Sequence, residues 1–177
     1  IDEDTSVIVS LLATDSDDNS SITYLVSIPP VHGNLEQNGS LLTYTPSLDY
    51  NGVDSLSYVA NDGEVDSDPA TILFQINAIN DSPELSSIGP LSFDEDGTLV
   101  HELSSVDVDS DELTYSITGG TDITASLDGS TITFSSTLDY NGSEEFEVIV
   151  SDSELSDSEV ITVSVLSIND APVASDI

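Results

Sequence analysis

The stretch Leu48-Asp49-Tyr50-Asn51-Gly52 recurs letter for letter as Leu138-Asp139-Tyr140-Asn141-Gly142. Four further blocks match in the same order around it: Asp2-Glu3-Asp4 with Asp94-Glu95-Asp96, residues 15–18 with 107–110, Val59-Ala60-Asn61-Asp62 with Val150-Ser151-Asp152, and Ile79-Asn80-Asp81-Ser82-Pro83 with Ile168-Asn169-Asp170-Ala171-Pro172. A near-constant offset of about 90 residues indicates two copies of one module. We predict a first repeat over residues 1–81, a second over 82–170, and the start of a following repeat at 171–177.

Apolar residues in each copy stand two apart, with mostly Ser, Thr, Gln or Asp beside them, which is typical of half-buried β-strands. The pattern is clearest at Val7 and Val9, Ile22 and Tyr24, Leu42 and Tyr44, Leu56 and Tyr58, and Ile72, Phe74 and Ile76. Turn pairs such as Asn38-Gly39 and Asp128-Gly129 separate these runs. No amphipathic helix of useful length is found. About seven short strands in about 90 residues predict an all-β fold, with two tandem Greek-key β-sandwich domains in an end-to-end array.

The charge balance restricts the possible partners. The chain has 35 Asp and Glu residues and no Lys or Arg. Two carboxylates about 4 Å apart repel by roughly 4 kcal/mol at an effective dielectric constant near 20, so clustered acids need an external cation or a strongly ionic solvent. Phosphate binding needs Lys and Arg, which excludes nucleic acid and direct contact with anionic membranes. A surface adapted to high salt remains an alternative explanation of the acidity.

Cysteine usage and hydropathy limit how the domains can be cross-linked or anchored to a membrane. No Cys is present, so neither a disulfide nor a thiolate metal site can stabilise the domains. Divalent cations could supply an equivalent cross-link. No apolar run is long enough to span a bilayer and no signal peptide opens the chain, so we expect any export signal or anchor to lie outside this sequence.

Five acidic motifs, taken in order, resemble the cadherin-type repeat. They are Glu3, Ala13-Thr14-Asp15-Ser16-Asp17, Leu48-Asp49-Tyr50-Asn51, Ala60-Asn61-Asp62 and Asn80-Asp81-Ser82-Pro83. The stretch His32-Gly33-Asn34-Leu35, followed by residues 42–46 and 49–52, is similar to the tandem cadherin-like repeats of large bacterial surface and secreted proteins. The resemblance covers nearly the whole chain and implies cadherin- or immunoglobulin-like domains.

The resemblance also implies Ca²⁺ at the junction between repeats. Ca²⁺ takes six to eight oxygen ligands, so such a site needs acidic residues from several loops. Carried over position by position, the junction ligands are Glu3, Asp49, Asn51, Asn80, Asp81, Asp107, Asp109 and Asp152. Two outer half-sites would use Asp15, Asp17 and Asp62 at one end, and Glu95, Asp139 and Asp170 at the other. Asn51 and Asn141 stand where the family has Glu. This difference should weaken the site, or Tyr-Asn-Gly forms a plain turn instead.

Two other site types find little support in the sequence. Residues 15–19 begin like an EF-hand loop, but Ser20 stands where Gly is needed and Val26 where the bidentate Glu should be. His32 and His101 occupy different positions in the two copies, so we expect surface or edge-strand residues and no catalytic role. A glycosidase cleft with paired carboxylates would need aromatic walls, and the chain has no Trp.

The sequence therefore predicts a non-enzymatic, calcium-binding structural and adhesion module, monomeric in isolation, whose partners are neighbouring repeats. The alternative is a carbohydrate-binding accessory module of a secreted polysaccharide-degrading enzyme, with a polysaccharide or cell-surface ligand. Exposed aromatic side chains would favour that alternative, but the tyrosines stand at alternating positions that suggest core packing.

Overall fold

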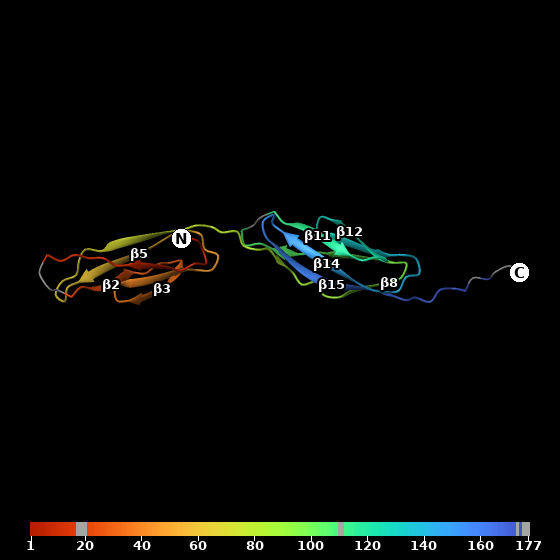
Figure 1. Ribbon diagram of the computed structural model, residues 1–177, viewed down its shortest axis with the longest axis horizontal. Helices are drawn as coiled ribbons and strands as arrows, with labels where there is room; N and C mark the ends of the chain where they lie inside the picture. Colours follow the sequence, from red (N-terminus) through yellow and green to blue (C-terminus); the bar gives the residue numbers. More distant parts are fainter. Residues whose placement is uncertain (17–20, 110–111, 173, 175–177) are drawn as a thin grey trace. The chain divides into compact units, whose positions relative to one another are not determined.

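The computed structural model describes residues 1–16, 21–109, 112–172 and 174 (Figure 1). Asp17 lies outside the described residues, as does most of the predicted third repeat. The chain divides into two compact units, Ile1–Ile79 (unit 1) and Asn80–Ile177 (unit 2). Each unit is described by itself below.

Unit 1 is a sandwich of two three-stranded sheets. Its strands are β1 (Val7–Ser10), β2 (Thr23–Ile28), β3 (Gly33–Asn38), β4 (Leu41–Pro46), β5 (Gly52–Asn61) and β6 (Ala70–Ile76). One sheet has the order β1-β4-β3 and the other β2-β5-β6, with antiparallel pairing throughout. Three connections, β1 to β2, β2 to β3 and β4 to β5, pass between the sheets, which gives the predicted Greek-key topology.

Unit 2 contains the same six-strand plan together with three further short strands. Its strands are β7 (Glu84–Leu85), β8 (Leu91–Asp94), β9 (Thr98–Glu102), β10 (Ser105–Val106), β11 (Thr114–Gly119), β12 (Ile123–Asp128), β13 (Thr131–Ser136), β14 (Gly142–Ser151) and β15 (Ser156–Leu166). The two main sheets are β12-β13-β9 and β11-β14-β15-β8, and β7 pairs with β10. β8 runs parallel to β15, whereas every other pair in unit 2 is antiparallel. In Figure 1, β11, β14 and β15 follow one another as neighbours, as the pairing requires.

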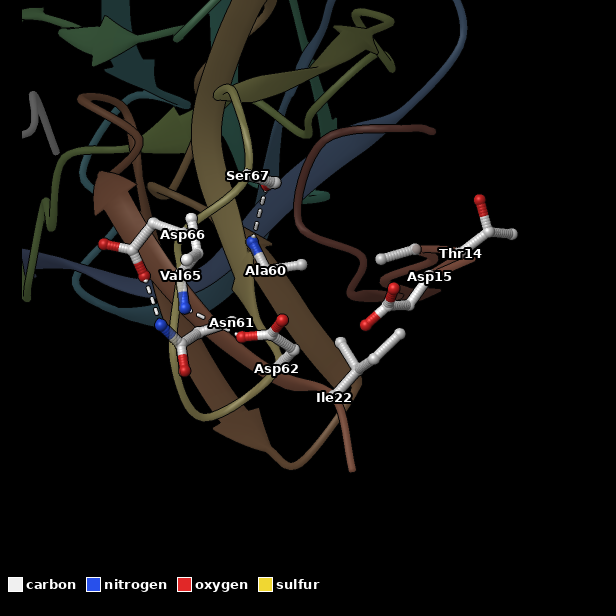
Figure 2. A pocket seen from close by; sticks show the side chains of 10 residues that line it. Thr14, Asp15, Ile22, Ala60, Asn61, Asp62, Val65, Asp66 and Ser67 are labelled. Carbon is white, nitrogen blue, oxygen red and sulfur yellow. Dashed lines mark hydrogen bonds between the residues drawn. The ribbon is translucent and has the colours of Figure 1, made fainter. Parts of the chain in front are cut away.

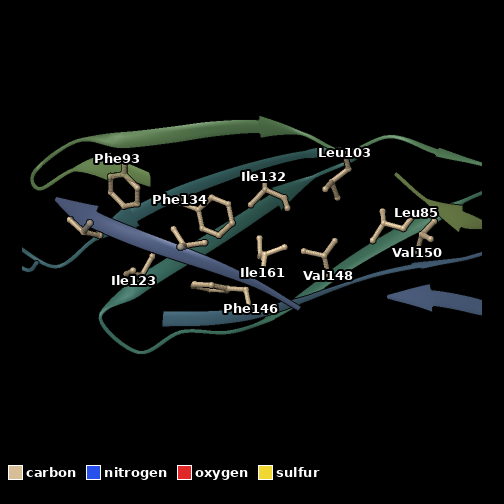
Figure 3. Close-up of a cluster of buried hydrophobic side chains, with 12 residues drawn as sticks. Leu85, Phe93, Leu103, Ile123, Ile132, Phe134, Phe146, Val148, Val150 and Ile161 are labelled. Atoms are coloured by element: carbon tan, nitrogen blue, oxygen red, sulfur yellow. The ribbon is translucent and has the colours of Figure 1, made fainter. Parts of the chain in front are cut away.

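Each unit has its own hydrophobic core between its sheets. In unit 1, Tyr44 of β4 stacks on Phe74 of β6 with ring centroids 4.1 Å apart. In unit 2, Phe134 of β13 meets Phe146 of β14 edge to face at 5.2 Å. Figure 3 shows both rings among the aliphatic side chains of the second core. Aromatic pairs in these geometries add about 0.5–1.5 kcal/mol beyond the burial of their area.

The structure confirms the predicted all-β fold in the described ranges, where no helix occurs. The period-two residues of β4 and β6 point inward, and Asn38-Gly39 and Asp128-Gly129 form tight turns with both glycines at positive φ. His32 is exposed ahead of β3, and His101 is half-buried on the edge strand β9. The residues that the structure describes include no helix long and apolar enough to cross a membrane.

Candidate functional site

A buried glutamate near the start of each unit fixes the segment that leaves the last strand. Glu3 is 3% exposed and Glu95 is 8% exposed. Glu3 Oε1 accepts a hydrogen bond from the Ile79 amide at 2.6 Å, and Glu95 Oε1 accepts one from the Ile168 amide at 2.6 Å. The two units therefore hold the residues ahead of Asn80-Asp81 and Asn169-Asp170 in the same way.

The aspartate that follows each glutamate lies beside an acidic loop, the one before β5 in unit 1 and the one before β14 in unit 2. The Asp49 amide donates to Asp4 Oδ1 at 3.1 Å, and the Asp139 amide donates to Asp96 Oδ1 at 3.2 Å. All four aspartates have φ between 56° and 60°, a left-handed conformation that Asp tolerates better than most residues. Both units thus present the same pair of tight acidic turns.

In unit 2, three carboxylates converge at this end of the sandwich. Oxygen atoms of Asp96, Asp139 and Asp170 all lie within 4.8 Å of one another. Desolvation raises the pKa of Asp139, and the charges of Asp96, Asp170 and Glu95 raise it further. The three side chains are exposed, and their mutual repulsion has no Lys or Arg to offset it. A divalent cation with a preference for oxygen ligands fits this donor set.

A second acidic group stands at the start of unit 2. The Asp109 amide donates to Asp107 Oδ1 at 2.9 Å, and the Asp81 amide donates to Asp109 Oδ2 at 2.8 Å. Asn80 Nδ2 donates to Asp152 Oδ2 at 2.8 Å, and this bond is the largest cause of the lowered pKa of Asp152. Asp107 Oδ2 is buried without a hydrogen-bond partner. A buried, unpaired carboxylate oxygen is costly unless a cation completes its coordination.

The corresponding end of unit 1 contains an open pocket of about 210 Å³. Figure 2 shows Thr14 and Asp15 facing Ala60 and Asp62 across it, with Ile22 between the two sides. Asp62 Oδ1 accepts hydrogen bonds from the amides of Val65 and Glu64, and these bonds lower its pKa. In unit 2, Asp152 Oδ1 accepts the equivalent bonds from Glu154 and Leu155.

The structure brings most of the predicted ligands of each unit into groups. Glu95, Asp139 and Asp170 lie together, as do Asn80, Asp81, Asp107, Asp109 and Asp152. Asn51 and Asn141 are exposed in the loops ahead of β5 and β14. Asp4 and Asp96 were missed by the sequence analysis. Both are the third residue of the repeated Asp-Glu-Asp block, in which only the glutamate was predicted to be a ligand.

A second pair of acidic residues, Asp54 and Glu144, was also missed, and it has a structural role. Asp54 is 5% exposed and accepts hydrogen bonds from the amides of Val31 and His32 and from the Tyr44 hydroxyl. Burial raises its pKa, but these bonds together bring the pKa below its ordinary value. Burial and the bond to Asp54 raise the pKa of Tyr44 well above its ordinary value, so its hydroxyl stays protonated and donates to Asp54.

Glu144 occupies the same position in unit 2. Its carboxylate accepts the amides of Thr121, Asp122 and Ile123, and the Thr121 bond is the largest cause of its lowered pKa. The two carboxylates therefore anchor equivalent loops, between β2 and β3 in unit 1 and between β11 and β12 in unit 2.

Comparisons with known proteins agree with this fold. A family model described as a bacterial Ig domain matches residues 1–75 and 80–164. The structure of human mucin-like protocadherin EC1-2 is 16% identical and aligns with a TM-score of 0.54 over 95% of this chain and 94% of that chain. Human protocadherin-24 EC1-2 is 17% identical, with a TM-score of 0.56 over 89% and 88% of the two chains. At these identities the likeness shows the fold alone, and it confirms tandem cadherin- or immunoglobulin-like domains.

Two further similarities concern much longer proteins. A segment of 45 residues, 25% of this chain, is 49% identical to integrin beta-like protein B of Dictyostelium discoideum and covers 2% of that protein. An endo-fucoidan hydrolase from glycoside hydrolase family 107 is 20% identical over 93% of this chain, with a TM-score of 0.39. The chain spans 26% of that hydrolase.

Proposed function

Because the chain belongs to the bacterial Ig domain family, we propose that it is a calcium-binding spacer and adhesion module of a secreted or cell-surface protein. Ca²⁺ bound where repeats join neutralises their carboxylates and stiffens the connection. The observation that carries the proposal is the convergence of Asp96, Asp139 and Asp170 within 4.8 Å in a chain with no Lys or Arg. The module has no catalytic role of its own.

The two ends of a unit are complementary as ligand sets. One end offers a buried glutamate and three aspartates, and the other offers the Asp107-Asp109 pair together with Asp152. The proposed ligands are the predicted set Glu3, Asp49, Asn51, Asn80, Asp81, Asp107, Asp109 and Asp152, with Asp4 added because its carboxylate accepts the Asp49 amide. Ca²⁺ suits this set because it accepts many oxygens in flexible geometry, whereas Mg²⁺ demands near-ideal octahedral coordination.

The direct test is thermal unfolding in millimolar Ca²⁺ and in excess chelator, at fixed high NaCl so that ionic screening stays constant. A ligand present at a hundredfold excess over its Kd stabilises the native state by about 2.7 kcal/mol per site. For a domain of this size, each kcal/mol raises the midpoint by about 4–8 °C. Equal midpoints in both conditions would refute calcium binding.

Variants identify the ligands. We expect D96N combined with D139N to abolish calcium binding at the end of unit 2, measured as lost stoichiometry by isothermal titration calorimetry. The control is E147Q, which removes one charge from an exposed position on β14. If E147Q lowered the stoichiometry as much as the double variant, the effect would come from net charge and not from coordination.

The spacer function predicts a calcium-dependent change in shape. Small-angle X-ray scattering of the wild-type chain should give a larger and better defined maximum dimension in Ca²⁺ than in chelator. Identical distance distributions in both conditions would exclude the stiffening role while leaving calcium binding intact.

Carbohydrate binding finds less support. Tyr44 is buried, and the other five tyrosines are half-buried and mostly packed against the two cores. Sugar-binding faces usually offer an exposed aromatic ring, and the side chains that are exposed here as large hydrophobics are aliphatic. Retention of the chain on insoluble polysaccharide would reverse this preference.

A further inference from the structure

Three asparagines of this chain are followed by glycine, in the pairs Asn38-Gly39, Asn51-Gly52 and Asn141-Gly142. Asparagine is a thermolabile residue, because the backbone amide nitrogen of the next residue can attack its side-chain carboxamide. Glycine has no Cβ and leaves that nitrogen accessible. All three asparagines are exposed, so neither the sequence nor the exposure of the side chain ranks them by reactivity.

Strand pairing holds the amide of Gly52. This glycine is the first residue of β5 and lies opposite Ile76 of β6. The next residue of that segment, Asn77, accepts a hydrogen bond from the Glu3 amide, away from β5. Because the backbone groups of successive residues alternate in direction along a strand, the carbonyl of Ile76 faces Gly52. The Gly52 amide is therefore part of the ladder and turns toward the Asn51 side chain only after local opening.

The amide of Gly142 is held in the same way. This glycine is the first residue of β14 and lies opposite Val165 of β15, and the next residue, Leu166, accepts the Glu95 amide. The carbonyl of Val165 therefore faces Gly142. The two copies of the Leu-Asp-Tyr-Asn-Gly motif thus protect their asparagines by equivalent contacts.

The amide of Gly39 lies outside the strand pairing. Asn38 and Leu41 are the last pair between β3 and β4, and Gly39 and Ser40 form the turn between them. Gly39 has a φ of 63°, and open space surrounds the position where a Cβ would lie. Among the described residues, neither the Gly39 amide nor the Asn38 carboxamide has a hydrogen-bond partner. The attacking nitrogen and the group that it attacks are both accessible at this turn.

The corresponding turn of unit 2 shows that an aspartate fits this position. Asp128 pairs with Thr131 as Asn38 pairs with Leu41, and Gly129 has a φ of 61°. An aspartate at position 38 therefore keeps the turn. An isoaspartate does not, because it adds one carbon atom to the main chain and disturbs the register of the pairs beside it.

We propose that Asn38 is the site at which the folded chain deamidates spontaneously, and that Asn51 and Asn141 are protected by their ladders. The Gly39 nitrogen loses its proton and bonds to Cγ of Asn38, whose amino group leaves as ammonia, which gives a succinimide. Water then cleaves one of the two ring C–N bonds, either at Cγ to give aspartate or at the backbone carbonyl carbon to give isoaspartate. Each event consumes one water, releases one ammonia and adds a negative charge at the tip of the hairpin.

The test follows each asparagine in the intact, folded chain during storage in mildly alkaline buffer. The buffer is made with water labelled with heavy oxygen, which marks every product of hydrolysis. Chymotrypsin then separates the three pairs, because Leu and aromatic residues flank each of them, whereas trypsin finds no Lys or Arg. Mass spectrometry should show Asn38 reacting at least about tenfold faster than Asn51 and Asn141, since these two must first open a ladder. An unchanged Asn38, or a rate at Asn51 or Asn141 that equals the rate at Asn38, would overturn the proposal.

The unfolded chain is the matched control. All three pairs consist of the same two residues, so their rates should be similar in concentrated urea. The difference measured in the folded chain is then due to structure. A preference for Asn38 that persists in urea would come from the neighbouring sequence and would contradict the protection by the ladders.

Variants identify the products. Asn38→Gln should lose the reaction on this hairpin, because the longer side chain would have to close a six-membered ring. Asn38→Asp should keep the unfolding midpoint of the fresh wild type, since unit 2 has Asp at this position. The stored wild type should contain, in addition, a less stable fraction that an isoaspartyl methyltransferase labels. If no fraction is labelled, no succinimide forms and the proposal is wrong.

The inference does not depend on calcium binding, because no proposed calcium ligand lies on the β3-β4 hairpin. If the turn reacts in the folded state, the rate at Asn38 should be the same in millimolar Ca²⁺ and in chelator. A rate that falls in Ca²⁺ would mean that the reaction waits for the domain to unfold, which contradicts the proposal. Calcium binding itself is judged from unfolding midpoints, so the two ideas fail separately.

Discussion

At the scale of single residues, this protein stabilises buried acids with backbone amides, because no side-chain cation is available. Asp54 and Glu144 each accept at least two main-chain N–H groups from a neighbouring loop. Hydrogen bonds to a charged acceptor contribute about 1.5–3 kcal/mol each, and an unsatisfied buried donor costs a comparable amount. These carboxylates are therefore structural, in contrast to the exposed trio at the end of unit 2.

We expect Asp54→Ala to destabilise unit 1 by about 3 kcal/mol, because the amides of Val31 and His32 lose their acceptor. Tyr44→Phe should cost about 1 kcal/mol, since only one bond to Asp54 is removed. Both losses in the free energy of unfolding are measured by urea denaturation, with hydrogen exchange of the β4 and β5 amides as the probe of unit 1. Asp68→Ala, at an exposed position, is the matched control and should stay within about 0.5 kcal/mol of the wild type.

The lowered pKa of Asp54 predicts the pH dependence of this effect. The folded state binds the proton more weakly than the unfolded state, so the stabilisation is complete above the ordinary pKa and is lost as the pH falls through the folded value. The stability difference between wild type and Asp54→Asn should be constant above about pH 5 and shrink below about pH 4. A difference that grows on acidification would contradict the assignment.

At the scale of elements, the segment between β7 and β8 depends on a side chain from β15. Glu159 accepts the amides of Ile88 and Gly89, and these bonds lower its pKa. They hold the chain where it passes from pairing with β10 to pairing with β15. The described residues between Leu85 and Leu91 belong to no strand, and Glu159 is the acceptor for the amides of Ile88 and Gly89 there.

Glu159→Ala should therefore raise the hydrogen-exchange rates of the Ile88 and Gly89 amides at least about tenfold, because local opening costs less without the acceptor. Glu147→Ala, an exposed change on β14, serves as the control and should leave both rates unchanged. Equal protection in both variants would show that the crossing is ordered without Glu159.

The sequence predicts the strands well because their information is local. Leu42 and Tyr44, or Ile72 and Phe74, reveal an inward face by their spacing of two. Asp54 follows the same rule, because it is in phase with the buried Leu56, but an acid in that phase was not considered as a core residue. Its partners, Val31 and His32, come from a distant loop and could not be found from spacing.

The candidate site is less predictable for the same reason. The repeated motifs pointed to Asp139 and Asp170, whose carboxylates lie within 4.8 Å of each other, and to Glu95, whose charge raises the pKa of Asp139. Asp96 joins Asp139 and Asp170 through a left-handed turn that sequence spacing does not specify. The pairing of β7 with β10 was also not predicted. Asn80 and Asp81 were predicted as ligands from their motif alone, and their contacts with Asp152 and Asp109 depend on tertiary structure.

At the scale of the whole molecule, charge repulsion is the dominant electrostatic effect. The formal net charge is −35, and no Lys or Arg reduces it. Repulsion between exposed carboxylates is screened beyond about 10 Å at 0.1 M salt but beyond only about 3 Å at 1 M. Folding should therefore be more favourable at high ionic strength, whether or not Ca²⁺ is bound.

In chelator, raising NaCl from 0.1 M to 1 M should increase the unfolding midpoints of both units by several degrees, measured by calorimetry. KCl should act equally, because screening does not depend on the identity of the cation. The same salt increase should have a smaller effect in millimolar Ca²⁺, since part of the repulsion is already neutralised. A midpoint that is independent of salt would mean that the carboxylates are too far apart to repel.

The parallel pairing of β8 with β15 has a mechanical consequence. When a chain is pulled from both sides of unit 2, Leu91–Asp94 and Val163–Leu166 slide in opposite directions, and their hydrogen bonds are loaded together in shear. Forced unfolding depends on the barrier to rupture and not on equilibrium stability. The parallel pair therefore sets the resistance of unit 2 to pulling, whatever its equilibrium stability.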